Sequence, residues 1–232
     1  ISDGEISLLS KSTGGKTVVT LAPETVPAEA IRRLADEGVI VCAGHSNATA
    51  ARIEEALENG VRGFTHLFNA MSQLTAREPG VVGAALNDAA SWCGIIVDGH
   101  HVDAMVLKIA LRAAPLKRFM LVSDAMPSVG GEKSFMLGGE KINVAEGRCV
   151  NADGTLAGSD LDMASAVRNA VSMLGLDLAD AVTMASANPA AFLGLDRELG
   201  HIAPRYRANL VLLDEDLEVA ETWIDGSLSG AD

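Results

Sequence analysis

The chain has 232 residues, of which 48% are hydrophobic and 3% aromatic, and its formal net charge is -13 at pH 7. This length and hydrophobic content suffice to bury the core of one large domain, or of one domain and part of another. The acidic charge argues against nucleic acid and anionic membrane as partners, because both favour a basic surface, although one or two well-placed arginines would still allow a small anionic substrate.

Apolar runs alternate with amphipathic segments along the first half of the chain. Residues 1–16 are polar and predict a loop or frayed start, and the small-residue segment 79–90 is assigned to neither helix nor strand. The predicted strands are the apolar runs 18–21, 39–43, 61–65, 93–97 and 119–123. The predicted helices run from Pro27 to the residue before Gly38, from Thr49 to Asn59 and from Asp103 to Ala114.

The five predicted strands are continuously apolar, which is typical of parallel strands covered on both faces. Repeated strand–helix units leave two α/β folds open, a (β/α)8 TIM barrel and an open doubly wound sheet. An open sheet binds its ligand at one switch point, whereas here four of the five strand ends carry polar groups, which favours the barrel. Because a barrel needs eight strands, we expect the missing ones to precede Ile1 in a longer protein.

The second half of the chain has a different pattern. The Gly-rich stretch 126–158 predicts hairpins at 135–139 and 142–144. Helices are predicted at about 160–174, 178–186 and 189–193, and antiparallel strands at 208–214 and 219–224. We therefore expect residues 1–200 to form the C-terminal part of the barrel and residues 201–232 to form strands of a small β domain.

Histidine and aspartate at the strand ends indicate a metal site that activates water. His45 and His66 follow successive strands and are 21 residues apart, or one strand–helix unit, so both imidazoles should enter one space. Neutral imidazole is a good ligand of zinc or iron, and two such ligands leave room for a carboxylate and a water. Asp124 fits a general base beside that water. The alternatives are buried hydrogen-bonded histidines and an aspartate that caps the next segment.

Three further positions are candidates for substrate contact. Of the adjacent pair His100 and His101, we assign His101 to the site and give His100 no role. Arg77, on the loop after His66, is a candidate anion clamp, with a surface ion pair to Glu78 as the alternative. The backbone amides of Leu156, Ala157, Gly158 and Ser159, before a helix expected near Asp160, could contact a polar ligand, with a plain helix cap as the alternative.

Cysteine usage bears on the compartment. Cys42, Cys93 and Cys149 are odd in number and two of them lie in apolar runs, so we expect no disulfide framework and a cytoplasmic protein. No apolar stretch is long enough to span a bilayer.

The motifs together resemble a known family, the N-acetylglucosamine-6-phosphate deacetylases of the metal-dependent amidohydrolase superfamily. They occur in family order and extend through nearly the whole chain. The matching motifs are VTLAPE (19–24), AGHSNAT (43–49), THLFNAM (65–71), REPG (77–80), DGHHVD (98–103), LVSDAM (121–126) and GTLAGSDLDM (154–163).

The resemblance implies a barrel of amidohydrolase type, here about strands 4–8, with part of a small β-sandwich domain. It implies that His45 and His66 bind a divalent metal (zinc, or alternatively iron) and that Asp124 is the catalytic acid/base. Asn69, Ala70, His101 and the segment Leu156, Ala157, Gly158, Ser159 would contact the sugar. Arg77 would hold the phosphate, possibly across the interface of a homodimer.

The reaction implied is hydrolysis of N-acetyl-D-glucosamine 6-phosphate to D-glucosamine 6-phosphate and acetate in amino-sugar catabolism. One departure from the family is that its further metal-ligating glutamate, in an EGP-type motif, does not occur here, and Glu24 does not replace it. Two alternatives therefore stay open: an amidohydrolase acting on another N-acyl substrate, and an inactive fragment that lacks the N-terminal metal ligands.

Overall fold

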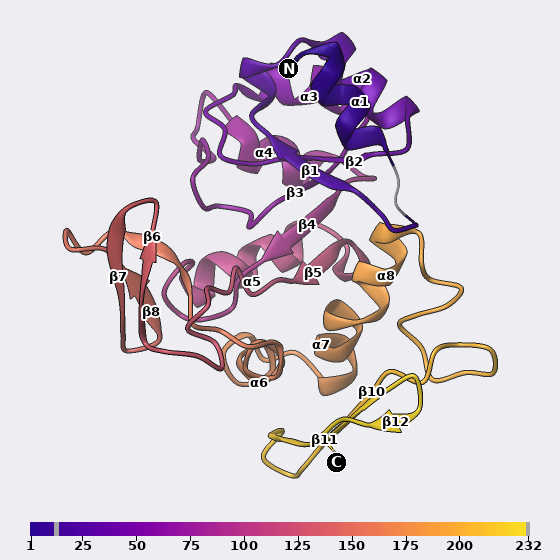
Figure 1. The fold of residues 1–232 in the computed structure, drawn as a ribbon. Helices are drawn as coiled ribbons and strands as arrows, with labels where there is room; N and C mark the ends of the chain where they lie inside the picture. The colour runs from indigo at the N-terminus through magenta and orange to yellow at the C-terminus, as the bar shows by residue number, and fades with distance from the viewer. Residues whose placement is uncertain (12–13, 231–232) are drawn as a thin grey trace. The chain divides into compact units, whose positions relative to one another are not determined.

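The computed structural model of the chain describes residues 1–11 and 14–230 (Figure 1). These residues form two compact units. Unit 1 comprises Ile1–Ile95 with Ile109–Met120, and unit 2 comprises Ile96–Lys108 with Leu121–Asp232. None of the helices in the described ranges is both long enough and apolar enough to cross a bilayer.

A sheet with the strand order β1-β2-β3-β4-β5 runs through unit 1, and its first four strands pair in parallel. The strands are β1 (Val18–Leu21), β2 (Ile40–Ala43), β3 (Val61–Phe64), β4 (Trp92–Ile95) and β5 (Phe119–Leu121). Four of them lie within the predicted apolar runs, and β4 overlaps its run 93–97 but begins one residue earlier, so the predicted strand positions are confirmed to within a residue or two. The helices of this unit are α1 (Asp3–Ser10), α2 (Ala28–Asp36), α3 (Ala50–Glu58) and α4 (Gly80–Asn87), with short 3-10 turns η1 (Pro23–Thr25) and η2 (Leu116–Arg118). Helix α5 (Ala104–Ala113) begins in unit 2 and ends in unit 1.

Burial explains why these segments fold as strands and helices. All four residues of β2 are buried, as expected for a central parallel strand. Helix α2 buries Ile31 and Leu34 on one face, and α3 buries Ile53 and Ala56. Their fully buried side chains form the core of unit 1 together with Phe64.

One assignment of secondary structure is wrong, and one helix is left without a prediction. Residues 3–10 form helix α1 rather than a loop, because Ser2 and Glu5 make a capping box that satisfies the first amides of the helix. The segment 79–90 contains helix α4, whose small residues are buried over most of its length. Since nearly every position of α4 is apolar or glycine, it has no amphipathic period that sequence reasoning could detect.

Unit 2 contains two antiparallel sheets and three consecutive helices (Figure 1). One sheet has the order β6-β7-β8-β9, with strands Ser134–Leu137, Glu140–Ala145, Arg148–Val150 and Leu156–Ser159. The helices are α6 (Met163–Leu174), α7 (Leu178–Ala185) and α8 (Ala187–Leu193). The last sheet consists of β10 (Leu210–Leu213), β11 (Val219–Ile224) and β12 (Ser227–Leu228). The predicted hairpins and the antiparallel C-terminal strands are confirmed.

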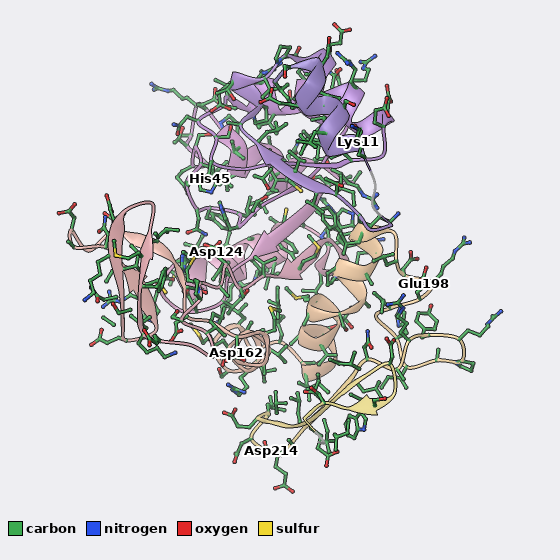
Figure 2. The ribbon with its side chains drawn as sticks, in the orientation of Figure 1. Lys11, His45, Asp124, Asp162, Glu198 and Asp214 are labelled. Atoms are coloured by element: carbon green, nitrogen blue, oxygen red, sulfur yellow. The ribbon has the colours of Figure 1, made fainter. Side chains whose placement is uncertain are left out.

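The region before α6 corrects another expectation. Residues 156–159 form strand β9 rather than a loop at a helix start. Helix α6 begins at Met163, and its N-cap is Asp162 (Figure 2). The side chain of Asp162 accepts a hydrogen bond from the backbone amide of Ser165. The predicted division between a barrel part (1–200) and a β domain (201–232) stays a prediction.

Candidate functional site

The two predicted metal ligands lie at the carboxyl ends of neighbouring strands. His45 follows β2 and His66 follows β3, and these strands are paired in the sheet. Their Nε2 atoms are 2.9 Å apart, and the rings meet edge to face with centroids 4.7 Å apart. Two imidazole lone pairs do not face each other at this distance without a proton or a cation between them. The structure therefore brings the two histidines together as predicted, and their role as metal ligands stays a prediction beside the alternative of a hydrogen-bonded pair.

The backbone at the predicted catalytic positions is unusual. His45, His66 and Asp124 have φ angles of 49°, 35° and 52°, in the left-handed region that residues other than glycine seldom adopt. Ala70 also has a positive φ, of 49°. Such conformations cost of order 1 to 3 kcal/mol each and concentrate at functional sites. His45, His66 and Asp124 were predicted from sequence for the chemistry of their side chains, and the structure places all three in this unusual backbone conformation.

The carboxylate of Glu24 accepts hydrogen bonds from the segment that carries His45 and fixes its position. Ser46 is fully buried and its Oγ donates to Glu24 Oε2 at 2.6 Å, while the amide of Asn47 donates to Glu24 Oε1 at 2.7 Å. Burial would raise the pKa of Glu24, but these hydrogen bonds outweigh it and the pKa is lowered. Gly44 is required just before His45, because a Cβ there would lie 2.7 Å from Thr20 Cγ2. Sequence reasoning gave Glu24 no role.

The loop after His66 carries the other candidate ligands of unit 1. The Asn69 side chain donates to the His66 carbonyl at 3.2 Å, so it shapes the loop. Arg77 is exposed on a turn closed by a hydrogen bond from Thr75 N to Glu78 O of 3.1 Å. The Glu78 carboxylate accepts from the amides of Ala50 and Gly80, and within the described ranges no ion pair to Arg77 is found. The ion-pair alternative for Arg77 therefore finds no support.

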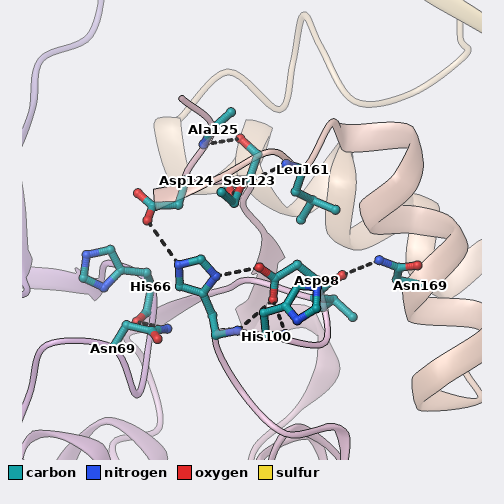
Figure 3. Close-up of polar contacts among 12 residues, drawn as sticks. His66, Asn69, Asp98, His100, Ser123, Asp124, Ala125, Leu161 and Asn169 are labelled. Atoms are coloured by element: carbon teal, nitrogen blue, oxygen red, sulfur yellow. Dashed lines mark hydrogen bonds and ion pairs between the residues drawn. The ribbon is translucent and has the colours of Figure 1, made fainter. Parts of the chain in front are cut away.

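In unit 2, a row of three side chains joins Asp98, His101 and Asp124 (Figure 3). Asp98 Oδ2 lies 2.6 Å from His101 Nδ1, and His101 Nε2 lies 3.9 Å from Asp124 Oδ2. The side chains of Asp98 and His101 are 4% and 5% exposed, whereas that of Asp124 is 41% exposed. The choice of His101 over its exposed neighbour His100 fits this geometry, because the two predicted residues His101 and Asp124 face each other.

The Asp98–His101 contact favours the charged forms of both groups. Burial would raise the pKa of Asp98, but hydrogen bonds from the His101 side chain and from the amides of His101 and His100 lower it from 3.8 to about 2. The same bond to Asp98 raises the pKa of His101 above 6.5 against the effect of burial. Both shifts follow from a carboxylate that receives three donors within one turn of chain.

Strand β9 holds the backbone of Asp124 in place. The amide of Ser159 donates to the Asp124 carbonyl at 2.9 Å, and the amide of Met126 donates back to the Ser159 carbonyl at 2.9 Å. Ser159 is fully buried and its hydroxyl donates to the carbonyl of Ser123. A Cβ on Gly158, whose φ is 108°, would lie 2.6 Å from Met126 Cγ. Leu156–Ser159, predicted to contact the sugar, thus supports the backbone of Asp124.

The residues present fit a metal ion in part. His45 and His66 supply two nitrogen donors of the kind that zinc and iron accept. Over residues 1–11 and 14–230, no cluster of three or more histidine, cysteine, aspartate or glutamate side chains is arranged to hold a metal.

The shifts at Asp98 and His101 predict how stability depends on pH. Asp98 has a lowered folded pKa, so its contribution is full above 3.8 and disappears as pH falls towards about 2. His101 has a raised folded pKa, so its contribution is full below 6.5 and disappears as pH rises through the raised value. In urea unfolding, the difference between wild type and Asp98→Asn should be about 2 kcal/mol between these limits and shrink on either side. A difference in the free energy of unfolding that does not change with pH would contradict this prediction.

The comparisons with known proteins establish the class. Residues 1–228 match the amidohydrolase family, and the chain belongs to this family. A crystal structure of N-acetylglucosamine-6-phosphate deacetylase from Pasteurella multocida is similar, with a TM-score of 0.94 and 35% identity over 99% of this chain and 60% of that one. This similarity confirms the expected α/β fold, a partial barrel of amidohydrolase type.

Two curated relatives carry names that differ in the sugar. N-acetylgalactosamine-6-phosphate deacetylase of Shewanella sp. (strain ANA-3) is 45% identical over 230 residues, which are 98% of this chain and 58% of that protein. N-acetylglucosamine-6-phosphate deacetylase of Vibrio furnissii is 35% identical over 212 residues, 90% of this chain and 53% of that protein. The chain thus spans little more than half the length of these relatives.

Proposed function

We propose that the protein hydrolyses the acetamide of an N-acetylated amino-sugar 6-phosphate, converting N-acetyl-D-glucosamine 6-phosphate into D-glucosamine 6-phosphate and acetate in amino-sugar catabolism. The observation that carries the proposal is the convergence of His45 and His66, with their Nε2 atoms 2.9 Å apart at the ends of paired strands. The names of the similar proteins support this substrate class.

His45 and His66 hold a divalent metal, with zinc as our first choice and iron as the alternative. When bound, such a metal supplies Lewis acidity that polarises a carbonyl and lowers the pKa of water. Asp124 accepts a proton from the attacking water as the carbon–oxygen bond forms. It then returns this proton to the nitrogen as the carbon–nitrogen bond breaks, so that acetic acid and the neutral amine form and Asp124 is again a carboxylate. The acid then gives its proton to the amine, and acetate and the ammonium product leave.

The remaining predicted residues bind the substrate. His101, Asn69, Ala70 and the segment Leu156–Ser159 contact the sugar, and Arg77 holds the phosphate through its guanidinium. We also propose a homodimer in which Arg77 serves the neighbouring subunit, and a cytoplasmic location. The free, buried state of Cys42, Cys93 and Cys149 supports that location.

A second candidate substrate is N-acetylgalactosamine 6-phosphate, the epimer at the fourth carbon of the sugar. It is favoured by the higher identity to the Shewanella protein, 45% against 35% for the Vibrio protein. The ratio of kcat/KM for the two epimers decides between them. Equal inactivity on both, with activity on another N-acylated compound, would support the alternative of a different amidohydrolase substrate. Inactivity on every N-acyl substrate would support the inactive-fragment alternative.

The phosphate role of Arg77 gives a specific prediction. Arg77→Ala should raise KM for the 6-phosphate at least tenfold, because a charge-assisted bidentate contact is lost, and should leave turnover of the unphosphorylated sugar unchanged. Steady-state kinetics on both sugars measures this. Arg112→Ala, an exposed arginine on α5, is the matched control. An equal loss on both sugars would exclude the phosphate contact.

A further inference from the structure

Asp98 is a buried, heavily hydrogen-bonded acid of unit 2 that the proposed reaction does not use. Its Oδ1 accepts from the amides of His100 and His101 at 2.8 and 2.9 Å, and its Oδ2 faces His101 Nδ1 at 2.6 Å. Both carboxylate oxygens of Asp98 are already engaged by these three partners, and its side chain is buried, so Asp98 is not placed to contact a substrate itself. Any effect on the reaction must therefore pass through a neighbour.

The loop that carries Asp98 is anchored to helix α6. Asn169 Nδ2 on α6 donates to the carbonyl of Val97 at 2.8 Å, beside Asp98 (Figure 3). Gly99 has a φ of 78°, and a Cβ there would lie 3.0 Å from Met173 Cε on the same helix. The loop is thus held on both sides of Asp98, and the carboxylate is fixed relative to His101.

The bond at Nδ1 determines what the other nitrogen of His101 can do. An imidazole whose Nδ1–H is held by a carboxylate keeps one ring orientation, and the carboxylate stabilises the imidazolium. Nε2 then points to Asp124, 3.9 Å away, an ion-pair separation longer than a hydrogen bond. A charged His101 at this position can donate to a substrate oxygen while it faces the Asp124 carboxylate.

We propose that Asp98 is a positioning residue of the deacetylation, which keeps His101 protonated at Nδ1 and oriented with Nε2 towards Asp124 and the substrate. This inference rests on the proposed function. In Asp98→Asn the amide would donate to Nδ1, so the ring would keep Nε2–H, while Nδ1 would lose its proton and the carboxylate that stabilises the imidazolium. The ring position is retained while its electrostatic role is removed.

The first test is the protonation of the ring, which needs no activity. In ¹⁵N spectra of the purified protein, His101 Nδ1 should carry a proton at pH 7 in the wild type and lose it in Asp98→Asn. A bare Nδ1 in the wild type would overturn the inference even if no variant folds. Asp103→Asn, the same change at an exposed residue of the same motif, should leave the His101 signals unchanged.

The second test is kinetic. Asp98→Asn should lower kcat about 10- to 100-fold and should change KM less. This loss of kcat is smaller than the roughly 10⁴-fold loss seen when the aspartate orients a histidine that is itself the catalytic base. If Asp98 acts through His101, adding Asp98→Asn to His101→Gln should cost nothing further. Additive losses would overturn the inference and indicate a structural role. An inactive wild type would instead contradict the proposed function, while the ¹⁵N result would still decide the ring's protonation and orientation.

Discussion

Asp124→Asn should lower kcat about 10²- to 10⁴-fold, the range for loss of a general acid/base, while KM and the free energy of unfolding change little. Asparagine has the same shape as aspartate but accepts no proton at neutral pH. It also tolerates the left-handed backbone, with φ of 52°, better than most residues. The bonds between β9 and residue 124 involve the main chain and so survive the change.

Steady-state deacetylation kinetics together with urea unfolding would check this prediction. Asp153→Asn, an exposed aspartate on a turn of the same unit, serves as the matched control and should behave as wild type. A variant at position 124 that kept more than about a tenth of wild-type kcat would contradict the assigned role, since even a modest acid/base contribution exceeds that factor.

The features that sequence predicted correctly are those that a short stretch of chain determines. Continuous apolar runs located every strand of the main sheet, because strands that are covered on both faces are apolar on both faces and form unbroken apolar runs. The positions of His45 and His66 two residues beyond β2 and β3 were enough to expect the imidazoles in one space, and their Nε2 contact agrees.

What sequence reasoning missed depends on contacts between segments distant in the chain, or on uniform composition. Glu24 acts on Ser46, 22 residues away, so nothing near it in sequence reveals the contact. Asp98 does have a local signal, an aspartate three residues before a histidine at a strand end, although it was given no role. Helix α4 was missed for a different reason, since a helix of small apolar residues has no polar face.

His45→Asn should lower the affinity for zinc by more than about 100-fold, because changing a residue that merely supports a ligand already costs about 10- to 100-fold. This position suits the test better than His66. His45 is exposed, so its loss leaves no cavity, whereas His66 is only 6% exposed. Asparagine also tolerates the φ of 49° at this position, so the backbone should persist.

Competitive titration with a chromophoric chelator measures the zinc affinity directly, and the loss of deacetylation should follow it. His201→Ala is the matched control, because His201 is exposed and its ring packs edge to face against the ring of Tyr206. Unchanged zinc affinity in His45→Asn, with an intact fold, would contradict the metal role of the histidine pair. In that case the 2.9 Å Nε2 contact would be an ordinary hydrogen bond between a neutral donor and a neutral acceptor.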